Sequence, residues 1–538
     1  MNCIARPSLA TQHQMEDTTS QSQSHYYFLY LWALVSLAFA LAAYRRFLTA
    51  ARANSDLRLP PGPWQLPVIG SLHHLVGQLP HRAMRDLARR HGPVMLLQLG
   101  ELPTVVVSTP DAAREVMRTQ DLTFASRPLT ASMRVLTNDG RDIAFAPYGE
   151  YWRQLRKIAV TELLTARRVL SFRAIREEEV AAMLRQVGSA ATAARPVEMR
   201  AHLTALVSNA TFRAVMGDRC KQRDVFLRVV DEVMQLSTGF NPADMWPSWS
   251  WLAGRLSNDM RRAKECHATL YDMFGGIIEE HLERMEGGGD GNGEAMDLLE
   301  VLLKIHKDGG VDMVAIKAVI FDVFIAGSES SATTLEWALA ELIKNPEAMK
   351  KATAEVRQAF DAGGRVVEDR LGELTYLHLV IREALRLHPP LPLLLPRLCR
   401  EPCKVLGFDV PRGTQVIVNA WALGRDEQHW PDATEEFRPE RFEAGTRAAT
   451  VDFRGADFEL LPFGAGRRMC PGIAFGLASV ELPLASLLLH FDWEAPDVSN
   501  PNEFDMTEAF GATARRNANL LLRPSLRVPL PTPPAQGV

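Results

Sequence analysis

Leu461-Pro-Phe-Gly-Ala-Gly-Arg-Arg-Met-Cys-Pro-Gly-Ile-Ala-Phe-Gly476 surrounds a single cysteine, Cys470, with glycine, proline and arginine. Glycine permits a sharp turn and a close backbone approach to a planar ligand. Proline after the cysteine suits a first helical turn, and the apolar sequence that follows predicts a helix as far as His490. The dipole and free N–H groups at a helix N-terminus favour the thiolate form of such a cysteine. The segment therefore predicts a single thiolate ligand for iron, with a buried structural cysteine as the alternative.

The spacing around the cysteine is specific. Five positions within ten residues follow one pattern, Phe463-x-x-Gly466-x-Arg468-x-Cys470-x-Gly472. This pattern resembles the haem-binding signature of the cytochromes P450, and the resemblance extends over nearly all of residues 60–530. It implies the cytochrome P450 fold, which is mainly α-helical with small β-sheets. It also implies a haem b whose iron is axially ligated by the Cys470 thiolate, with Phe463 and Arg468 as cofactor-binding residues.

A second motif, Glu383-Ala-Leu-Arg386, resembles the Glu-x-x-Arg helix of the same family. Side chains at positions i and i+3 share one helix face and can form an ion pair. Phe437-Arg-Pro-Glu-Arg-Phe442 resembles the family's Pro-Glu-Arg-Phe element. The resemblance implies that Arg441 joins Glu383 and Arg386 in a buried charged cluster. The alternative is an ordinary exposed pair, which contributes under about 1 kcal/mol.

A third motif, Trp152-Arg-Gln-Leu-Arg156, resembles the family's Trp-x-x-x-Arg element. The resemblance implies that Trp152 and Arg156 point toward a haem propionate, and that Arg397 and Arg468 are further propionate partners. Arginine suits this role because it is always charged and can bind a carboxylate with two parallel hydrogen bonds. The alternative for Arg156 and Arg397 is a solvated side chain.

Residues 311–344 form one long pattern that is apolar on most sides, which predicts a central buried helix ending before Pro346. Its middle, Ala326-Gly-Ser-Glu-Ser-Ser331, is small and polar. The family has an acid followed by an alcohol here, which implies that Glu329 and Ser330 relay protons to iron-bound dioxygen. Serine stands where threonine is usual and lacks the methyl group that restricts the rotamer, so we expect more leakage to peroxide, with Thr334 able to assist.

Acidic residues recur every seven positions along the same helix, at Asp322, Glu329 and Glu336. This spacing also fits a polar stripe that is simply solvated or paired.

The substrate pocket is placed by resemblance alone. The residues expected to line it are apolar, which favours a lipophilic substrate; they are Ile325, Ala326, Leu393, Leu394 and Phe510. The alternative is that these side chains are ordinary core residues.

An uncharged apolar stretch at residues 26–44 is long enough to span a bilayer as a helix. Arginines follow it, so the positive-inside rule places the N-terminus outside and the body in the cytosol, as a single-pass membrane protein. The resemblance to microsomal cytochromes P450 implies that this membrane is the endoplasmic reticulum, with the N-terminus in its lumen. A cleaved signal peptide is the alternative, and the arginines directly after the apolar stretch disfavour it. The expected organisation is a disordered luminal tail at 1–25, an anchor at 26–44, a basic and proline-rich hinge at 45–67, a catalytic domain at 68–530 and a C-terminal tail at 531–538.

Composition limits the class of protein. The net charge of −4, from 60 Lys and Arg against 64 Asp and Glu, disfavours a nucleic-acid partner. Six cysteines in 538 residues, with no CxxC pair, are too sparse for a disulfide scaffold and disfavour structural zinc. Residues 94–108 predict a β-hairpin, helical patterns dominate from 110 to 345, and short strands are expected within 403–419 and 516–528.

The resemblance implies a plant microsomal monooxygenase that oxidises a lipophilic small molecule of specialised metabolism, of terpenoid, phenolic or lipid-derived type. Electrons would come from NADPH through cytochrome P450 reductase, with cytochrome b5 as a further partner. Two alternatives stay open: a haem isomerase or dehydratase on the same fold that needs no reductase, and a non-catalytic membrane haem or sterol binder.

Overall fold

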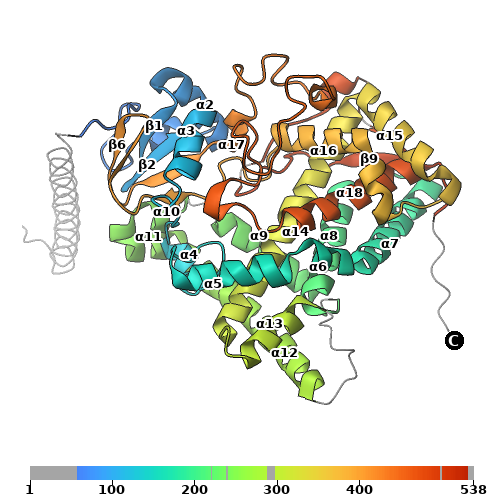
Figure 1. Ribbon diagram of the computed structural model, residues 1–538, viewed down its shortest axis with the longest axis horizontal. Coiled ribbons are helices and arrows are strands. Elements are labelled where there is room, and N and C mark those ends of the chain that lie inside the picture. Colours follow the sequence, from blue (N-terminus) through green and yellow to red (C-terminus); the bar gives the residue numbers. More distant parts are fainter. Residues whose placement is uncertain are drawn as a thin grey trace, which may run out of the picture.

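The computed structural model describes residues 57–530 except 220, 238–239, 287–296, 497, 499 and 510 (Figure 1). The predicted luminal tail, membrane anchor, most of the hinge, Phe510 and the C-terminal tail lie outside the described residues.

Helices dominate the described part of the chain, as the sequence predicts. The α-helices are α2 (Pro80–His91), α3 (Pro110–Arg114), α4 (Ala131–Leu136), α5 (Glu150–Ile158), α6 (Ala166–Ser171), α7 (Arg173–Thr192), α8 (Met199–Met216), α9 (Arg223–Leu236), α10 (Pro242–Met245), α11 (Ser250–Ser257), α12 (Asp259–Glu286), α13 (Leu298–Lys307), α14 (Met313–Lys344), α15 (Pro346–Phe360), α16 (Thr375–Leu387), α17 (Ala420–Leu423) and α18 (Ile473–His490). The strands are β1 (Val94–Leu99), β2 (Leu102–Val107), β3 (Val197–Glu198), β4 (Arg397–Leu398), β5 (Cys403–Val405), β6 (Phe408–Val410), β7 (Gln415–Val418), β8 (Phe491–Glu494) and β9 (Leu521–Leu526).

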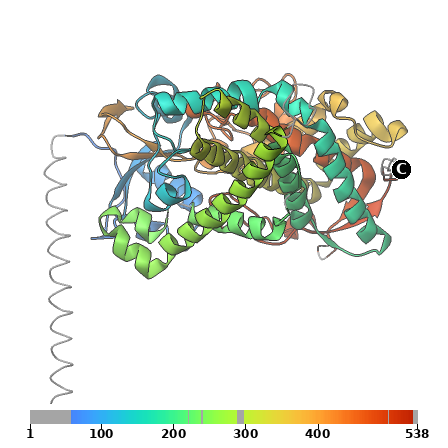
Figure 2. The ribbon, with the colours of Figure 1, turned by 90° about the horizontal axis from the view of Figure 1, so that it is seen from below.

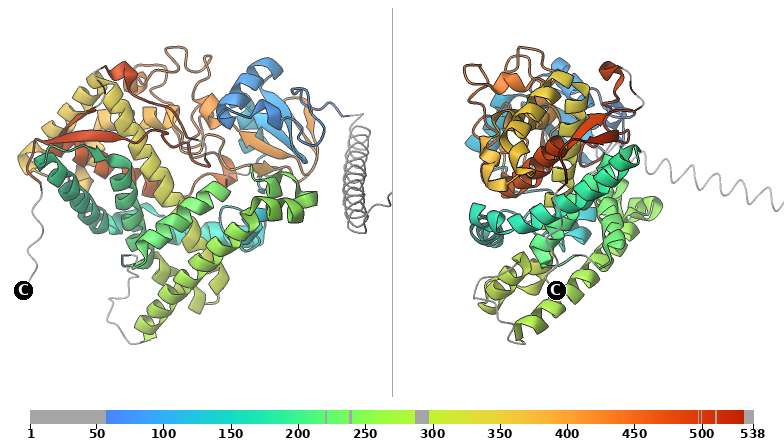
Figure 3. Two further views of the ribbon diagram at one scale, coloured as in Figure 1. Left: turned by 180° about the vertical axis from the view of Figure 1, so that it is seen from behind. Right: turned by 90° about the vertical axis from the view of Figure 1, so that its right-hand side faces the viewer.

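The strands form small sheets at the two ends of the molecule. A four-stranded sheet has the order β1-β2-β7-β4, and its antiparallel β1–β2 hairpin is the one predicted over 94–108. Strand β7 joins β2 in parallel, with Thr104 opposite Gln415, although the two strands are about 300 residues apart. A three-stranded sheet, β3-β9-β8, lies at the opposite end, and Figures 1 and 3 show the helical layer between the two sheets. Seen from below, α12 runs diagonally across the helices (Figure 2).

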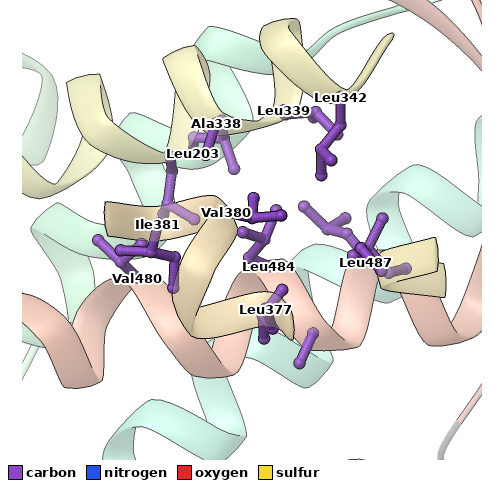
Figure 4. Close-up of a cluster of buried hydrophobic side chains, with 14 of the residues drawn as sticks. Leu203, Ala338, Leu339, Leu342, Leu377, Val380, Ile381, Val480, Leu484 and Leu487 are labelled. Atoms are coloured by element: carbon purple, nitrogen blue, oxygen red, sulfur yellow. The ribbon is translucent and has the colours of Figure 1, made fainter. Parts of the chain in front are cut away.

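The helical core is built around α14, which packs against α8, α16 and α18. Figure 4 shows aliphatic side chains from these four helices meeting between them, including Leu203, Leu339, Val380 and Leu484. All four side chains are buried, and burying one aliphatic side chain of this size contributes about 1.5–3 kcal/mol. The apolar pattern of residues 311–344 therefore correctly predicts a central buried helix.

Helix α18 begins three residues after Cys470 and continues that core. Of the described helices, it is the one long and apolar enough to cross a membrane, and 67% of it is buried inside the protein. This burial is what a core helix requires, because such a helix is covered by the rest of the chain.

The described end of the proline-rich hinge lies against the first sheet. The Leu96 N–H group in β1 donates to the Pro61 carbonyl oxygen at 2.9 Å. A Cβ atom on Gly62 would lie 2.0 Å from the Leu96 carbonyl oxygen, so glycine is required for this approach. Hydrogen bonding to the sheet gives this short segment a fixed position on the body.

A buried charged cluster ties α16 to the irregular segment 424–441. Arg386 donates both Nε and Nη2 to the Glu383 carboxylate, at 2.7 and 2.8 Å, and Arg441 Nε donates to the same carboxylate at 2.8 Å. The remaining guanidinium N–H groups of both arginines donate to backbone carbonyls, including those of Thr434 and Ala433. Glu383 is 0% exposed, so this carboxylate neutralises two guanidinium groups out of contact with water.

We expect Glu383→Gln to lower the free energy of unfolding by about 3–5 kcal/mol, because it leaves two buried guanidinium groups without a counter-charge. Urea unfolding of the full-length protein in detergent, followed by tryptophan fluorescence, measures the change. The matched control is Glu373→Gln, whose partner Arg370 sits three residues away in an exposed pair, for which we expect under about 1 kcal/mol. Equal losses in the two variants would contradict the cluster's structural role.

Candidate active site

A cavity of about 350 Å³ lies between α14, the turn at 142–145, the segment 390–397 and the loop that carries Cys470. Its size is at the lower end of the range for small-molecule sites. Most of its lining is apolar, and a few polar groups converge on it, which is the usual design of a ligand pocket.

The loop before α18 holds Cys470 at the wall of this cavity. Gly464 and Gly466 have φ angles of 66° and 69°, in the left-handed region that favours glycine. A Cβ atom on Gly466 would lie 2.2 Å from the Met117 carbonyl oxygen. The Cys470 N–H group donates to the Phe463 carbonyl oxygen at 3.0 Å, which closes the loop and fixes the direction of the thiol.

The charge state of the Cys470 thiol depends on opposing effects. Burial raises its pKa, while the Gly472 N–H group, 3.4 Å from Sγ, and the charge of Arg156 lower it. Burial is the largest effect, so the helix N-terminus alone does not produce the thiolate that the sequence suggested. A cation bound at Sγ would reverse this balance, because a metal ion deprotonates the thiol that coordinates it.

Four guanidinium groups line the same cavity, those of Arg127, Arg156, Arg397 and Arg468. Burial lowers the pKa of each. The positive charge of Arg397 lowers the pKa of Arg127 and of Arg468 further, and the pKa of Arg468 falls to about 9. The N–H groups of Arg127, Arg397 and Arg468 donate largely to backbone carbonyls, such as that of Ala465, which accepts from Arg397 at 2.8 Å. The positive charge is therefore fixed in place but poorly neutralised.

Arg127 was not identified from the sequence. It lies between Ser126 and Pro128 in an irregular segment, where periodicity gives no information on which way a side chain points. Its Nη1 group donates to the Leu395 carbonyl at 2.7 Å, a contact that only the tertiary fold creates.

Trp152 and Arg156 lie on α5, one turn apart, and both line the cavity. The Trp152 indole N–H group donates to the Ile143 carbonyl at 3.0 Å, and the Arg468 guanidinium stacks 4.3 Å from its ring centre. Arg156 has no ion pair within the described part of the chain, so its charge faces the cavity.

These residues fit a haem. The carboxyl groups on the cavity wall cannot balance four guanidinium groups, because Asp142 and Asp322 accept backbone N–H groups of the turn at 143–146 and Glu329 is paired with Arg515. Asp121 neutralises Arg397, at 3.3 Å, from outside the cavity. Two propionates would supply the missing negative charge on one side, and an iron ion would stabilise the Cys470 thiolate on the other.

On the opposite wall, α14 presents the small polar residues that the sequence singled out. Ser330 donates its hydroxyl to the Ala326 carbonyl one turn back, at 2.6 Å, and Thr334 does the same to the Ser330 carbonyl at 2.9 Å. Glu329, Ser330 and Thr334 all line the cavity.

Glu329 is held by partners from three segments. Its Oε1 atom accepts from Arg515 Nε at 2.7 Å and from Arg200, Thr333 and Thr513 at 3.2 Å each. Arg515 also pairs with Asp231, which is half-exposed, so ion pairs connect Glu329 to the surface.

The three acidic residues that recur along α14, Asp322, Glu329 and Glu336, all have partners in the structure, which was one of the two interpretations of their spacing. Arg200 binds both Glu329 and Glu336, and Asp322 accepts two backbone N–H groups from the turn that begins after Asp142. None of the three carboxylates is simply solvated.

The predicted substrate contacts divide between cavity and core. Ile325, Ala326 and Leu394 line the cavity. Leu393 is not among its lining residues and packs against the buried cluster around Leu97. Leu394 has a φ angle of 52°, and its N–H group donates to the Leu391 carbonyl at 3.1 Å, so the chain turns at this point.

The fold and the site together define the class of protein. A model of the family described as Cytochrome P450 matches residues 60–521, and the chain belongs to the cytochrome P450 family. This makes it an oxidoreductase of the monooxygenase type, in a family that binds haem through a cysteine thiolate.

Two similar curated proteins are plant enzymes. Desmethyl-deoxy-podophyllotoxin synthase of Sinopodophyllum hexandrum is 45% identical over 479 residues, covering 88% of this chain and 93% of the relative. Premnaspirodiene oxygenase of Hyoscyamus muticus is 46% identical over 479 residues, covering 87% and 93%. Among solved structures, a zebrafish cytochrome P450 with abiraterone superposes with a TM-score of 0.69 at 25% identity, covering 83% of this chain and 99% of that one.

We expect Gly466→Ala to weaken cofactor retention, because the added Cβ atom clashes with the Met117 carbonyl and the left-handed backbone costs about 1 kcal/mol or more. The measurement is the ratio of bound haem to purified protein. Gly276→Ala in α12 is the control, since its Cβ atom would meet nothing within 4 Å. Full haem occupancy in both variants would show that the loop tolerates the change.

Proposed function

We propose that this protein is a haem-thiolate monooxygenase that inserts one atom of O2 into a lipophilic small molecule of plant specialised metabolism. Electrons would come from NADPH through cytochrome P450 reductase, with cytochrome b5 as a further partner. The observation that carries the proposal is a single cavity lined by the half-buried Cys470 thiol, by four guanidinium groups and by apolar side chains.

In this proposal Cys470 holds the iron, while Arg156, Arg397 and Arg468 bind the propionates. Trp152 and Phe463 take part less directly: the indole stacks on Arg468, and the Phe463 carbonyl fixes the Cys470 backbone. When bound with a thiolate ligand, haem supplies the activation of dioxygen, since thiolate donation favours O–O cleavage. The protein supplies cofactor placement, electrostatics and exclusion of water.

Glu329 and Ser330 supply protons in the proposed reaction. The Ser330 hydroxyl lies on the cavity wall, where it donates to the Ala326 carbonyl. It can rotate to donate into the cavity instead, and a water molecule can then donate to the Ala326 carbonyl in its place. Glu329 is buried, and its pairing through Arg515 to Asp231 offers a polar route from the surface. Thr334, one turn further along, provides a second hydroxyl on the same wall.

The substrate class follows from the apolar wall and from the relatives. Ile325, Ala326 and Leu394 offer contacts without charge, which suits a terpenoid, phenolic or lipid-derived molecule. The names of the two plant relatives, a podophyllotoxin-type synthase and a premnaspirodiene oxygenase, support a substrate of this kind.

The proposed location is the endoplasmic reticulum membrane, with the uncharged stretch at 26–44 as a single anchor and residues 68–530 in the cytosol. Such an anchor would hold the cavity near the bilayer in which lipophilic substrates dissolve.

The test is turnover by microsomes that contain the full chain and a plant reductase, screened against a metabolite library with product mass spectrometry. We expect product that requires both NADPH and reductase, and a ferrous carbon monoxide complex with the long-wavelength Soret band of thiolate ligation. Cys470→Ala should abolish that band and the product together, because the iron loses its protein ligand. Product formed without NADPH would identify a reductase-independent isomerase or dehydratase, and haem binding without any turnover would favour a binding protein.

A second prediction concerns the hydroxyl on α14. We expect Ser330→Ala to reduce product per NADPH by about tenfold, with the missing electrons appearing as peroxide. This is less than the roughly 10²-fold effect of losing a unique proton donor, because Thr334 remains. Ser328→Ala is the matched control, since this serine is on the same helix but is not a lining residue of the cavity. If both variants couple NADPH to product as the unaltered protein does, Ser330 has no part in proton delivery.

A further inference from the structure

In the turn at 143–146, beside the cavity, each backbone N–H group donates to a carboxylate. The N–H groups of Ile143 and Ala144 donate to Asp322 Oδ2 on α14, at 2.6 and 3.1 Å. Those of Phe145 and Ala146 donate to Asp142 Oδ1, both at 2.9 Å. Two carboxyl groups therefore fix four consecutive peptide groups.

The carbonyl oxygens of the same turn accept from residues of the haem site. Ile143 accepts from the Trp152 indole at 3.0 Å and from Arg468 at 3.2 Å. Ala144 accepts from Arg127 at 2.9 Å and from Arg468 at 3.3 Å. The turn therefore connects two groups of side chains. Its N–H groups bind the two carboxyl groups, and its carbonyl oxygens bind the guanidinium groups and the indole that line the cavity.

The two carboxyl groups also face each other. Ionised carboxylates only accept hydrogen bonds, so a hydrogen bond between Asp142 and Asp322 requires that one of them carries a proton. Asp142 Oδ2 is buried and accepts no hydrogen bond from a described donor group, which leaves it available for such a proton. Burial raises the pKa of Asp142 to about 6, and burial together with the charge of Asp142 raises the pKa of Asp322 well above its usual value.

We propose that Asp322 and Asp142 are positioning residues which, by sharing one proton, hold the turn at 143–146 and through it set the indole and guanidinium groups that receive the haem. This inference rests on the proposed haem site, because it assigns the two carboxyl groups on the cavity wall a role in positioning the residues that would bind the haem.

Charged and titratable groups surround the pair on every packed element. Arg468 and Arg127 face Asp142 from the cysteine loop and the segment before α4, Tyr151 faces it from α5, and Tyr271 faces both carboxyl groups from α12. Burial raises the pKa of both tyrosines, that of Tyr271 to about 12, so neither ionises near neutral pH. Guanidinium groups keep their charge. The carboxyl pair is therefore the group here that titrates near neutral pH.

The direction of the pH effect follows from these raised pKa values. The folded protein retains a proton that the unfolded chain releases near pH 3.8, the ordinary pKa of an aspartate side chain, so the pair's contribution to stability falls as pH rises through the folded pKa. Above that pH both carboxylates are charged and repel each other, which loosens the turn. Asp322→Asn removes this effect, because an amide oxygen can accept the two N–H groups while its NH2 group donates to Asp142 at every pH.

The experiment compares the holoprotein with Asp322→Asn, Asp322→Leu and the exposed control Asp308→Asn. Haem release is followed by transfer to excess apomyoglobin between about pH 5 and about pH 8, a range that brackets the Asp142 pKa of about 6 and stays below the Arg468 pKa of about 9. Hydrogen exchange is measured on the peptide that covers 141–148. We expect release from the unaltered protein to accelerate about tenfold or more as the pair ionises, and release from Asp322→Asn to be flat over the same range. Asp322→Leu should raise exchange at 143 and 144 and release haem fastest, while Asp308→Asn follows the unaltered protein.

Two results would overturn the inference: a pH profile for Asp322→Asn that follows the unaltered protein, or Asp322→Leu with unchanged exchange at 143 and 144. If Asp322→Leu does not fold, the profile of Asp322→Asn decides alone. These outcomes are separate from failure of the proposed function, in which the unaltered protein itself would bind no haem or give no turnover.

Discussion

Excess positive charge held away from water is the constraint on which the rest of the site depends. Four guanidinium groups face one cavity, and their removal from water lowers the pKa of each. An arginine does not escape this cost by losing its proton, so the protein must place carbonyl oxygens around each group or admit an anion. The backbone carbonyls at 125, 143, 144, 395 and 465 meet the first need, and a dicarboxylate cofactor would meet the second.

The same constraint explains the position of the acidic groups. Glu383 lies where two arginines enter the core, Asp121 pairs with Arg397 behind the cavity, and Glu329 is held by Arg200 and Arg515. Each carboxylate that could have neutralised the cavity wall is committed to another cation or, for Asp142, to a second carboxyl group. The pocket thus retains its attraction for an anionic ligand, although the net charge of the whole chain is −4.

Sequence periodicity was enough to predict the elements with strong local patterns. The long apolar pattern that becomes α14, the apolar stretch after Cys470 and the 94–108 hairpin are all present in the structure. The parallel pairing of β2 with β7 left no local trace, because its two halves lie far apart in the chain. Arg127 and the Asp142–Asp322 pair were missed for the same physical reason: they sit in irregular segments or on a helix face whose neighbour the sequence does not specify.

The order of the first sheet has a consequence for biosynthesis. Strands β1 and β2 are made early, but β7, which completes their pairing, emerges about 300 residues later, and Cys470 and Thr513 follow still later. Contacts of such long range form slowly, since the intervening chain must first be closed into a loop. No nascent fragment that ends before residue 470 contains Cys470, so with this cysteine as the proposed iron ligand, capture of the cofactor would be a late event in synthesis.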